Sequence, residues 1–376
     1  MLNHNYSAAG GLCFPTSIRE VGKKKVILKI LKILSKKMKK FVSTIFMLVI
    51  LFLPATSDAK REHLIEGRTM GTTYHITVVT DDLKGVGGLK EKIDVRLEDI
   101  NRVFSTYLED SEISRFNALN NAGEKFRVSD EFIQVLKVGR KIHQLSEGAW
   151  DGTVNPLVDL WGFGPTQRET KMPAAGAIKE RLDRVGFDRI QIIAPNFIVK
   201  NSASITLDLN SIAKGFAVDQ VSQLIAASGF ENYLVEIGGE VYAAGLRKDG
   251  KKWRIGINKP QKNAAFNAVY KVVSLSNKAF ATSGDYRNFF EINGVRYSHV
   301  IDPRTGYPVS NGIVGVSIIA NNCTLADSLA TAIMVMGVEM GIPLMNRLDN
   351  VEGLIVIEES DGSLADFYST GFNVGN

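Results

Sequence analysis

Cysteine is almost absent from this chain of 376 residues, which contains only two. Cys13 lies in a basic N-terminal stretch, and Cys323 is the single cysteine of residues 60–376. An intramolecular disulfide within that C-terminal body is therefore excluded, and so is a zinc site built from clustered thiolates. We expect Cys323 to be a packed small residue at the start of a helix rather than a nucleophile.

Several motifs of nucleotide and metal enzymes are also missing. The sequence has no His-x-x-x-His pair, no Gly-x-Gly-x-x-Gly after an expected strand and no Gly-x-x-x-x-Gly-Lys-Ser/Thr loop. These absences disfavour a zinc enzyme, a dinucleotide-binding fold of the Rossmann type and a P-loop nucleotidase.

The C-terminal body lacks an excess of positive charge, although the whole chain has a net charge of +5. Residues 1–59 contain ten Lys and Arg against two Asp and Glu, whereas residues 60–376 contain 35 against 38. The body is therefore mildly acidic. Because nucleic-acid-binding domains usually carry a basic face, we expect no nucleic-acid partner.

The basic N-terminal stretch has the layout of a secretory signal. Four lysines surround Met38, an uncharged run covers residues 41–53, and small residues follow Pro54. The pattern predicts a signal peptide at 38–59 and hence export, with an uncleaved N-terminal anchor as the alternative. Residues 1–37 are predicted to be unstructured, or mis-assigned if Met38 is the true start. No cysteine lies directly after the uncharged run, which excludes lipid attachment there.

Residues 60–376 are predicted to form one α+β domain. Amphipathic periods predict helices, and short alternating runs separated by turn residues predict strands joined in hairpins, as at Asn293-Gly294. The main expected helices are 89–104, 112–119, 129–146, 177–185 and 325–336. Frequent hairpins favour mixed, largely antiparallel sheets with flanking helices over a doubly wound parallel sheet.

The stretch 204–219 is predicted to form a buried strand, a tight polar turn and then a helix. Apolar residues alternate over 204–209 and change to a helical period from Ile212. We expect Asn210 or Ser211 to cap this helix.

Charged residues flank that turn. Asp208 ends the expected strand, and Lys214 falls in the first helical turn, where free N–H groups and a partial positive charge suit an anion such as phosphate. The spacing therefore predicts an anion site. The alternative is an ordinary ion pair between Asp208 and Lys214 beside a core helix.

The segment 148–164 is rich in glycine and aromatic residues and has no clean period. Trp150 and Trp161 near Asp151 are suited to wrapping a flat ligand, and structural coverage is the alternative. His299 lies at the end of a hairpin strand, just before the expected tight turn 302–306, where a general base could act near neutral pH.

Asp327 and Thr331 are four residues apart on one expected helix and so point the same way. A carboxylate and a hydroxyl are hard oxygen ligands of the kind that Mg²⁺ accepts together with waters and substrate phosphates. The alternative is a solvated Asp and a Thr that bonds back into its own helix.

Six motifs taken together resemble those of the ApbE family, the exported bacterial FAD:protein FMN transferases. In chain order they are Met70-Gly71-Thr72, Ala149-Trp150-Asp151 with Val154-Asn155-Pro156-Leu157-Val158, the run from Asp208 to Gly215, the run from Glu236 to Glu240, the run from Ser298 to Gly306, and the run from Asp327 to Thr331. The resemblance covers about residues 64–370.

The resemblance implies a reaction and a set of ligands. The family moves FMN from FAD onto a Thr or Ser hydroxyl of a target protein through a phosphodiester bond and releases AMP. It implies a Mg²⁺ ion held by Asp327, Thr331 and the main-chain carbonyl of Ser211. It implies FAD contacts at Met70, Ala149, Trp150, Asp151, Asp208, Lys214 and Ile301. His299 is then the candidate base, and we expect Lys214 to neutralise charge on the pyrophosphate.

Three departures from the family pattern stand out. Trp150 replaces the usual Phe or Tyr, Asn210-Ser211 replaces the common Gly or Ser pair, and the lipid-attachment cysteine of many members is missing. The resemblance implies a periplasmic enzyme, or one associated with the inner membrane and facing the periplasm. Its acceptor is expected to be a membrane electron-transfer subunit. A Mg²⁺-dependent FAD pyrophosphatase and a non-catalytic flavin-binding protein are the alternatives.

Overall fold

The computed structural model describes residues 17–51, 60–81, 83–164, 172–261, 264–265, 268–285, 289–292 and 295–374. The chain divides into two compact units, Met1–Ala59 and Lys60–Asn376, and each is described by itself.

The N-terminal unit contains one helix, α1 (Ser17–Leu51). We expected no structure over residues 1–37, whereas residues 17–37 form the first part of this helix, because their Leu, Ile and Lys residues are compatible with helical geometry. The expected cleavage region after Pro54 lies outside the described residues. Within the described part of the chain, no helix combines the length and apolarity that a membrane crossing requires.

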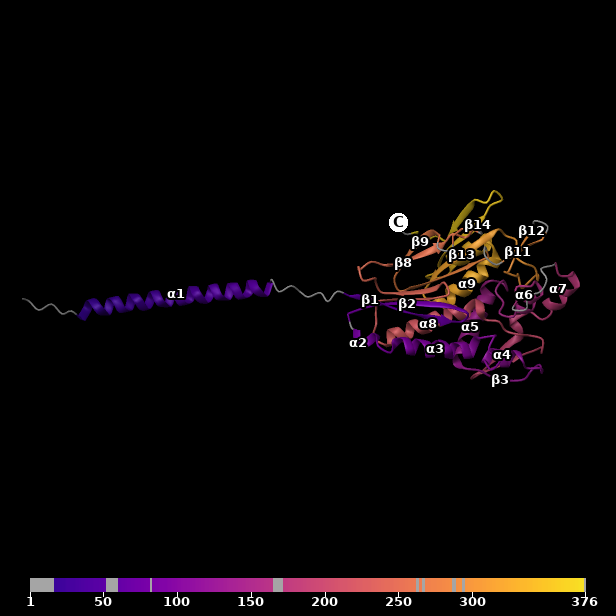
Figure 1. The fold of residues 1–376 in the computed structure, drawn as a ribbon, viewed down its shortest axis with the longest axis horizontal. Coiled ribbons are helices and arrows are strands. Elements are labelled where there is room, and N and C mark those ends of the chain that lie inside the picture. Colours follow the sequence, from indigo (N-terminus) through magenta and orange to yellow (C-terminus); the bar gives the residue numbers. More distant parts are fainter. Residues whose placement is uncertain are drawn as a thin grey trace, which may run out of the picture. The chain divides into compact units, whose positions relative to one another are not determined.

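The body is built on an eight-stranded sheet whose neighbouring strands are all antiparallel over the residues that the structure describes (Figure 1). In spatial order the strands are β1 (Arg61–Thr69), β2 (Thr72–Thr80), β6 (Tyr233–Ile237), β7 (Glu240–Ala244), β10 (Lys278–Gly284), β13 (Ile313–Ala320), β14 (Glu352–Glu358) and β15 (Leu364–Tyr368). This sheet and its flanking helices confirm the prediction of a mixed, largely antiparallel α+β body.

Smaller elements complete the described body. Three small sheets are formed by β3 (Phe126–Arg127) with β5 (Phe197–Lys200) and β4 (Ile190–Ile193), by β8 (Trp253–Asn258) with β9 (Val269–Leu275), and by β11 (Phe289–Ile292) with β12 (Val295–Ser298). The shorter helices are α2 (Leu83–Val86), α4 (Glu112–Asn117), α6 (Asn155–Leu160), α7 (Ala175–Leu182), α10 (Val338–Arg347) and a 3₁₀ turn at Phe187–Arg189.

The two faces of the large sheet are covered differently. Helices α3 (Leu89–Phe104), α5 (Asp130–Leu145), α8 (Asn210–Ala227) and α9 (Cys323–Met336) lie on one side, and the β8–β9 hairpin lies on the other (Figure 1). Strand β10 shows the alternation: Ala279 and Ala281 enter the helical core, while Phe280 enters the core beneath β8 and β9. Period-two patterning thus supplies both cores from single strands.

Helices α8 and α9 touch almost backbone to backbone. A Cβ atom on Gly215 would lie 2.7 Å from the carbonyl carbon of Cys323 and 2.8 Å from Cβ of Asp327, so only glycine fits. One turn further along α8, the Asp219 carboxylate accepts hydrogen bonds from the Cys323 and Thr324 N–H groups at 2.7 and 2.8 Å. Cys323 is buried at the start of α9, as expected.

The predicted strand over 204–209 is wrong, although its alternation is right. Ile205, Leu207 and Leu209 are fully buried, yet the segment joins no sheet. Its main-chain groups bond to a side chain instead. The Leu207 N–H donates to Asn117 Oδ1 at 2.7 Å, and Asn117 Nδ2 donates to the Leu207 carbonyl at 2.8 Å. The capping prediction is also wrong. Leu209 is the N-cap residue and makes no side-chain cap bond, while Asp208 accepts from the Asn210 N–H at 2.9 Å.

At one end of the body, α6, α7 and the β11–β12 hairpin lie together (Figure 1). We expected no regular structure over 148–164, but α6 forms there with Pro156 in its first turn, where proline needs no N–H donor. Aromatic rings join the parts, since Trp161 stacks on Tyr297 at 5.7 Å and Phe163 stacks on Phe290 at 5.2 Å. The Asn293-Gly294 turn lies outside the described residues, and the strands on either side of it pair as a hairpin.

Candidate functional site

A cavity of about 690 Å³ opens between the N-terminal half of α8, helix α9, the 149–164 segment and the chain around residue 300. Ten of the eleven predicted site residues line it: Ala149, Trp150, Asp151, Asp208, Ser211, Lys214, His299, Ile301, Asp327 and Thr331. Met70 does not line it. It sits in the β1–β2 turn with a positive φ of 48° and packs on the main core. The fold thus gathers residues that the sequence separates by about 180 positions.

The predicted metal ligands form one corner of this cavity. The Gly215 N–H donates to Asp327 Oδ2 at 3.0 Å. In an α-helix, the acceptor of that N–H is the carbonyl four residues earlier, which here belongs to Ser211. The carboxylate and the carbonyl therefore converge on the same amide.

Thr331 completes this corner from the next turn of α9. Its hydroxyl lies 3.1 Å from Ser283 Oγ on β10, so it contacts the neighbouring strand. No cluster of three or more His, Cys, Asp or Glu suited to a metal occurs among the described residues. A carboxylate, a hydroxyl and a carbonyl are hard oxygen ligands that fit Mg²⁺ with substrate phosphates, and they do not fit zinc.

Lys214 lies beside this corner between two carboxylates. Its Nζ is 2.9 Å from Glu240 Oε1 and 3.9 Å from Asp327 Oδ1. Burial lowers the pKa of Lys214, but the charges of Asp327 and Glu240 outweigh burial and raise it overall. Burial, assisted by Asp327, raises the pKa of Glu240 to about 8, even though Lys214 opposes the shift. The single ammonium of Lys214 does not compensate two carboxylates, so Glu240 holds a proton near neutral pH.

Glu240 is a site residue that sequence reasoning missed. Its side chain is buried, and Oε2 has no hydrogen-bond partner within the described part of the chain. A buried carboxylate oxygen without a partner is costly, which marks this position as built for something other than stability. The available signal was its place directly after Gly238-Gly239, where a Cβ on Gly238 would lie 2.8 Å from the Thr72 methyl group.

Asp208 lies just before the N-terminus of α8 and lines the cavity. Burial, with a contribution from the charge of Asp159, raises the pKa of Asp208, while the Asn210 N–H opposes the shift. The ion pair between Asp208 and Lys214, which was the alternative to an anion site, is not formed, since Lys214 Nζ lies beside Glu240 instead. The anion-site interpretation of this stretch stays a prediction.

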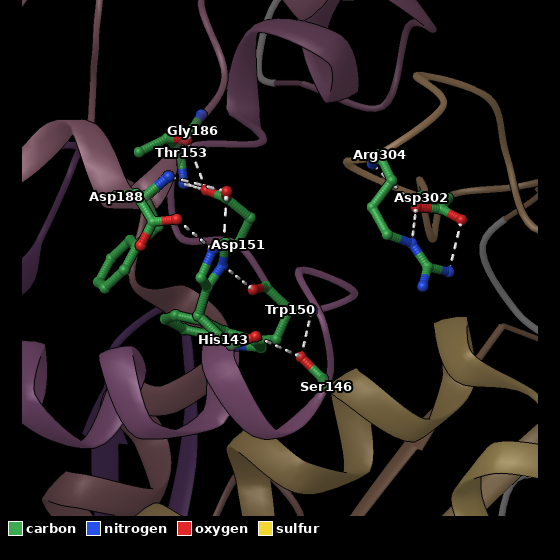
Figure 2. A network of polar contacts seen from close by, with 10 residues as sticks. His143, Ser146, Trp150, Asp151, Thr153, Gly186, Asp188, Asp302 and Arg304 are labelled. Atoms are coloured by element: carbon green, nitrogen blue, oxygen red, sulfur yellow. Dashed lines mark hydrogen bonds and ion pairs between the residues drawn. The ribbon is translucent and has the colours of Figure 1, made fainter.

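Hydrogen bonds within the 149–164 segment and to neighbouring residues hold the segment in place (Figure 2). Asp151 Oδ1 accepts from the Thr153 N–H at 2.7 Å, and Oδ2 accepts from the Phe187 N–H at 2.9 Å. His143 Nδ1 lies 2.8 Å from the Trp150 carbonyl oxygen. Burial raises the pKa of Asp151 despite these donors. Both carboxylate oxygens of Asp151 therefore accept hydrogen bonds that hold the loop in place.

The tryptophans do not offer faces to a flat ligand as expected. Trp150 and Trp161 are each only 1% exposed, because Trp150 packs edge-on against Phe187 and Trp161 stacks on Tyr297. Trp150 instead donates from Nε1 to Ser211 Oγ at 2.9 Å and ties the loop to α8. Two more accessible aromatic side chains, Phe163 and Tyr107, line the cavity and were missed by the sequence reasoning.

His299 enters the cavity from the end of the β11–β12 hairpin. Its ring meets Phe163 edge-on, with the centroids 6.2 Å apart. The following turn is tight, as predicted, because the Gly306 N–H donates to the Asp302 carbonyl at 2.8 Å. Arg304 then pairs with Asp302 through two 2.9 Å contacts (Figure 2). The Trp161 indole donates to the Gly306 carbonyl at 2.8 Å, which fixes this turn against the loop.

Comparison with known proteins gives a consistent result. A family model described as the ApbE family matches residues 70–355. A FAD:protein FMN transferase of Vibrio cholerae serotype O1 is 41% identical over 315 residues, covering 84% of this chain and 92% of that protein. One from Haemophilus influenzae is 38% identical, covering 86% and 95%.

Solved structures agree with this result. The flavin transferase ApbE from Vibrio cholerae superposes with a TM-score of 0.75 at 39% identity, covering 83% of this chain and 98% of that one. The apo form of Pseudomonas stutzeri flavinyl transferase ApbE gives 0.74 at 36% identity, covering 83% and 95%. With the family match spanning most of the body, the chain belongs to the ApbE family.

Proposed function

We propose that this protein transfers FMN from FAD to a Thr or Ser hydroxyl of an acceptor protein, with Mg²⁺ as the cofactor. The observation that carries the proposal is the convergence of an oxygen-ligand corner, a half-buried lysine and a histidine around one cavity. The names of the relatives, FAD:protein FMN transferase, support flavin transfer as the activity of this transferase.

The charges of the cavity suit a pyrophosphate. Lys214 lies at the start of α8, where its ammonium and the free N–H groups of the helix favour bound anions. Asp327, Thr331 and the Ser211 carbonyl would hold Mg²⁺, which supplies Lewis-acid stabilisation of phosphoryl oxygens. Lys214 then neutralises charge that develops on the bridging oxygen as the bond to it breaks.

Transfer requires a hydroxyl to be activated. The acceptor oxygen attacks the phosphorus on the FMN side, and the bond from that phosphorus to the bridging oxygen breaks. AMP leaves with the electron pair, and a ring nitrogen of His299 takes the hydroxyl proton. Phe163 packs edge-on against the His299 ring, and both side chains line the cavity.

The location and the partner are part of the same proposal. The signal-like pattern over 38–59 supports export, so we place the enzyme in the periplasm or on the inner membrane facing it. The acceptor is proposed to be a subunit of a membrane electron-transfer complex, which this modification would load with flavin.

The test is incubation of the processed chain with FAD, Mg²⁺ and a co-expressed candidate acceptor, followed by mass spectrometry. A covalent FMN adduct on the acceptor together with AMP supports transfer. FMN and AMP without an adduct would instead identify a pyrophosphatase, in which water takes the place of the acceptor hydroxyl. Unchanged FAD that remains bound would identify a flavin-binding protein without turnover.

A further inference from the structure

The Glu240 carboxyl is buried beside the cavity, and Lys214 is its side-chain partner within the described part of the chain. Oε1 lies 2.9 Å from Lys214 Nζ, whereas Oε2 has no hydrogen-bond partner among the described residues. Glu240 is only 4% exposed, so its burial has a cost in free energy that no second bond offsets. The contact with Lys214 is therefore what this carboxyl supplies to the site.

Glu240 holds Lys214 from a fixed position in the large sheet. It begins β7, directly after the Gly238-Gly239 turn. The Gly239 N–H donates to Glu236 Oε1 at 2.6 Å, which fixes that turn. The turn also bounds the lysine, because a Cβ on Gly238 would lie 3.4 Å from Lys214 Cδ. The aliphatic part of Lys214 thus lies against the turn, and its ammonium group reaches Glu240.

Asp327 competes with Glu240 for the same ammonium group. Asp327 Oδ1 lies 3.9 Å from Lys214 Nζ, farther than the 2.9 Å of Glu240 Oε1. Asp327 also supplies the carboxylate of the proposed Mg²⁺ corner. If Lys214 came into direct contact with Asp327, it would compete with the metal ion for that carboxylate, because both are cations that bind its oxygens.

We propose that Glu240 is a positioning residue, which holds Lys214 away from Asp327 and so leaves the Asp327 carboxylate available to a divalent cation. The inference rests on the proposed function and explains how one cavity keeps a lysine beside a metal ligand. One N–H of the ammonium group bonds Glu240, and the other two are left for the pyrophosphate. Glu240 acts through Lys214 and is assigned neither to the metal nor to FAD.

The two distances determine the size of the expected effect. If Lys214 Nζ moved from 3.9 Å to 2.9 Å from Asp327, their attraction at an effective dielectric constant of about 20 would strengthen by about tenfold in the equilibrium constant. A divalent cation would have to overcome this added attraction to bind the carboxylate. Loss of the Glu240 oxygen should therefore weaken metal binding about tenfold.

The test is a double-mutant cycle on Mn²⁺ binding by the full chain at pH 7 without FAD, with free Mn²⁺ measured by electron paramagnetic resonance. Glu240→Met removes the oxygen at similar side-chain length and should raise the Kd for Mn²⁺ about tenfold. Glu240→Gln is the matched control. Its amide oxygen still accepts from Lys214, so its Kd should stay within about twofold of wild type. Lys214→Met should lower the Kd by a factor about ten times larger in Glu240→Met than in the wild-type chain.

An equal effect of Lys214→Met in both backgrounds, or a wild-type Kd in Glu240→Met, would overturn the positioning role. A tenfold loss of affinity in Glu240→Gln would make the Glu240 carboxylate a direct part of the metal site, which also overturns it. If Glu240→Met does not fold, Glu240→Asp takes its place, because the shorter side chain withdraws the oxygen from Lys214.

The same experiment separates this inference from the proposed function. Mn²⁺ binding that is absent from the wild-type chain would overturn the metal corner of the proposed function and the positioning role together. A cycle with the expected coupling, in a chain that forms no FMN adduct on any acceptor, would overturn transfer alone.

Discussion

The two walls of the cavity are held in different ways. The helical wall, formed by α8 and α9, depends on backbone contact at Gly215 and on the Asp219 cap of α9. The loop wall, formed by residues 149–164 and 299–306, depends on side-chain hydrogen bonds and stacked rings, as at Asp151 and Trp161. Two backbones in direct contact cannot move apart without displacing their helices. A set of side-chain contacts can lose one contact while the others keep the segment in place. We therefore expect a single substitution in the helical wall to disrupt the cavity, and a single substitution in the loop wall to weaken it only in part.

The largest effect is expected for Gly215→Ala. The added methyl group would force α8 and α9 apart and displace Asp327, so the free energy of unfolding should fall by about 3 kcal/mol or more. Thermal unfolding of the body checks this. Gly176→Ala on α7 is the matched control, because a Cβ there meets nothing within 4 Å. Equal stability of the two variants would contradict the close contact between α8 and α9 at Gly215.

Asp327→Ala should lower FAD-dependent turnover about 1000-fold by removing the carboxylate of the proposed Mg²⁺ corner. The Gly215 N–H also loses one of its two acceptors and keeps the Ser211 carbonyl, so the cost in stability should stay at about 1 kcal/mol or less. Turnover and its dependence on added Mg²⁺ are the measurements, with exposed Asp349→Ala as the control. Full activity at low Mg²⁺ would remove Asp327 from the mechanism.

On the loop wall, His299→Ala should slow transfer about 100-fold if the ring acts as the base. FAD binding should change little, because Phe163 and Ile301 still line the cavity. Single-turnover transfer and equilibrium binding of FAD separate the two effects. An equal loss in both would give His299 a positioning role only.

A smaller effect is expected for His143→Ala, which removes the contact to the Trp150 carbonyl. The loop should loosen, raising the KM for FAD about fivefold and lowering the stability by about 1 kcal/mol. His143→Asn retains a donor at a similar position and should recover most of both. A normal KM in the alanine variant would mean that the loop wall is held without this bond.

A pH-dependent effect is expected at Glu240, the buried carboxyl that contacts Lys214 of the helical wall. Its pKa in the folded chain, about 8, lies above the ordinary value of 4.5, so between these pH values the folded state binds a proton that the unfolded state does not. Its stabilising contribution is complete below pH 4.5 and is lost as the pH rises through about 8. Glu240→Gln should remove this dependence, which thermal unfolding at pH 5 and pH 8 would reveal as a shallower decline than in the wild-type chain.

Several helices of the body could be predicted from the sequence because local periodicity determines them. The α3 pattern gave a helix with the observed bounds, and the capping residue Ser129 was identified from its type and position. The spacing of Asp327 and Thr331 placed both on one helical face, and both line the cavity. The loop wall was predicted less well. Trp150 and Trp161 were expected to wrap a flat ligand, with structural coverage as the alternative, and packing against Phe187 and Tyr297 favours that alternative.

The sequence by itself determined the class of the body, the order of its motifs and the family to which they belong, because these depend on residue types and short spacings. The tertiary structure alone decided that residues 204–209 are not a strand, that Lys214 pairs with Glu240, and that Trp150 donates to Ser211 rather than facing a ligand. Each of these depends on which groups from distant segments come within hydrogen-bond reach, and no local pattern records that distance.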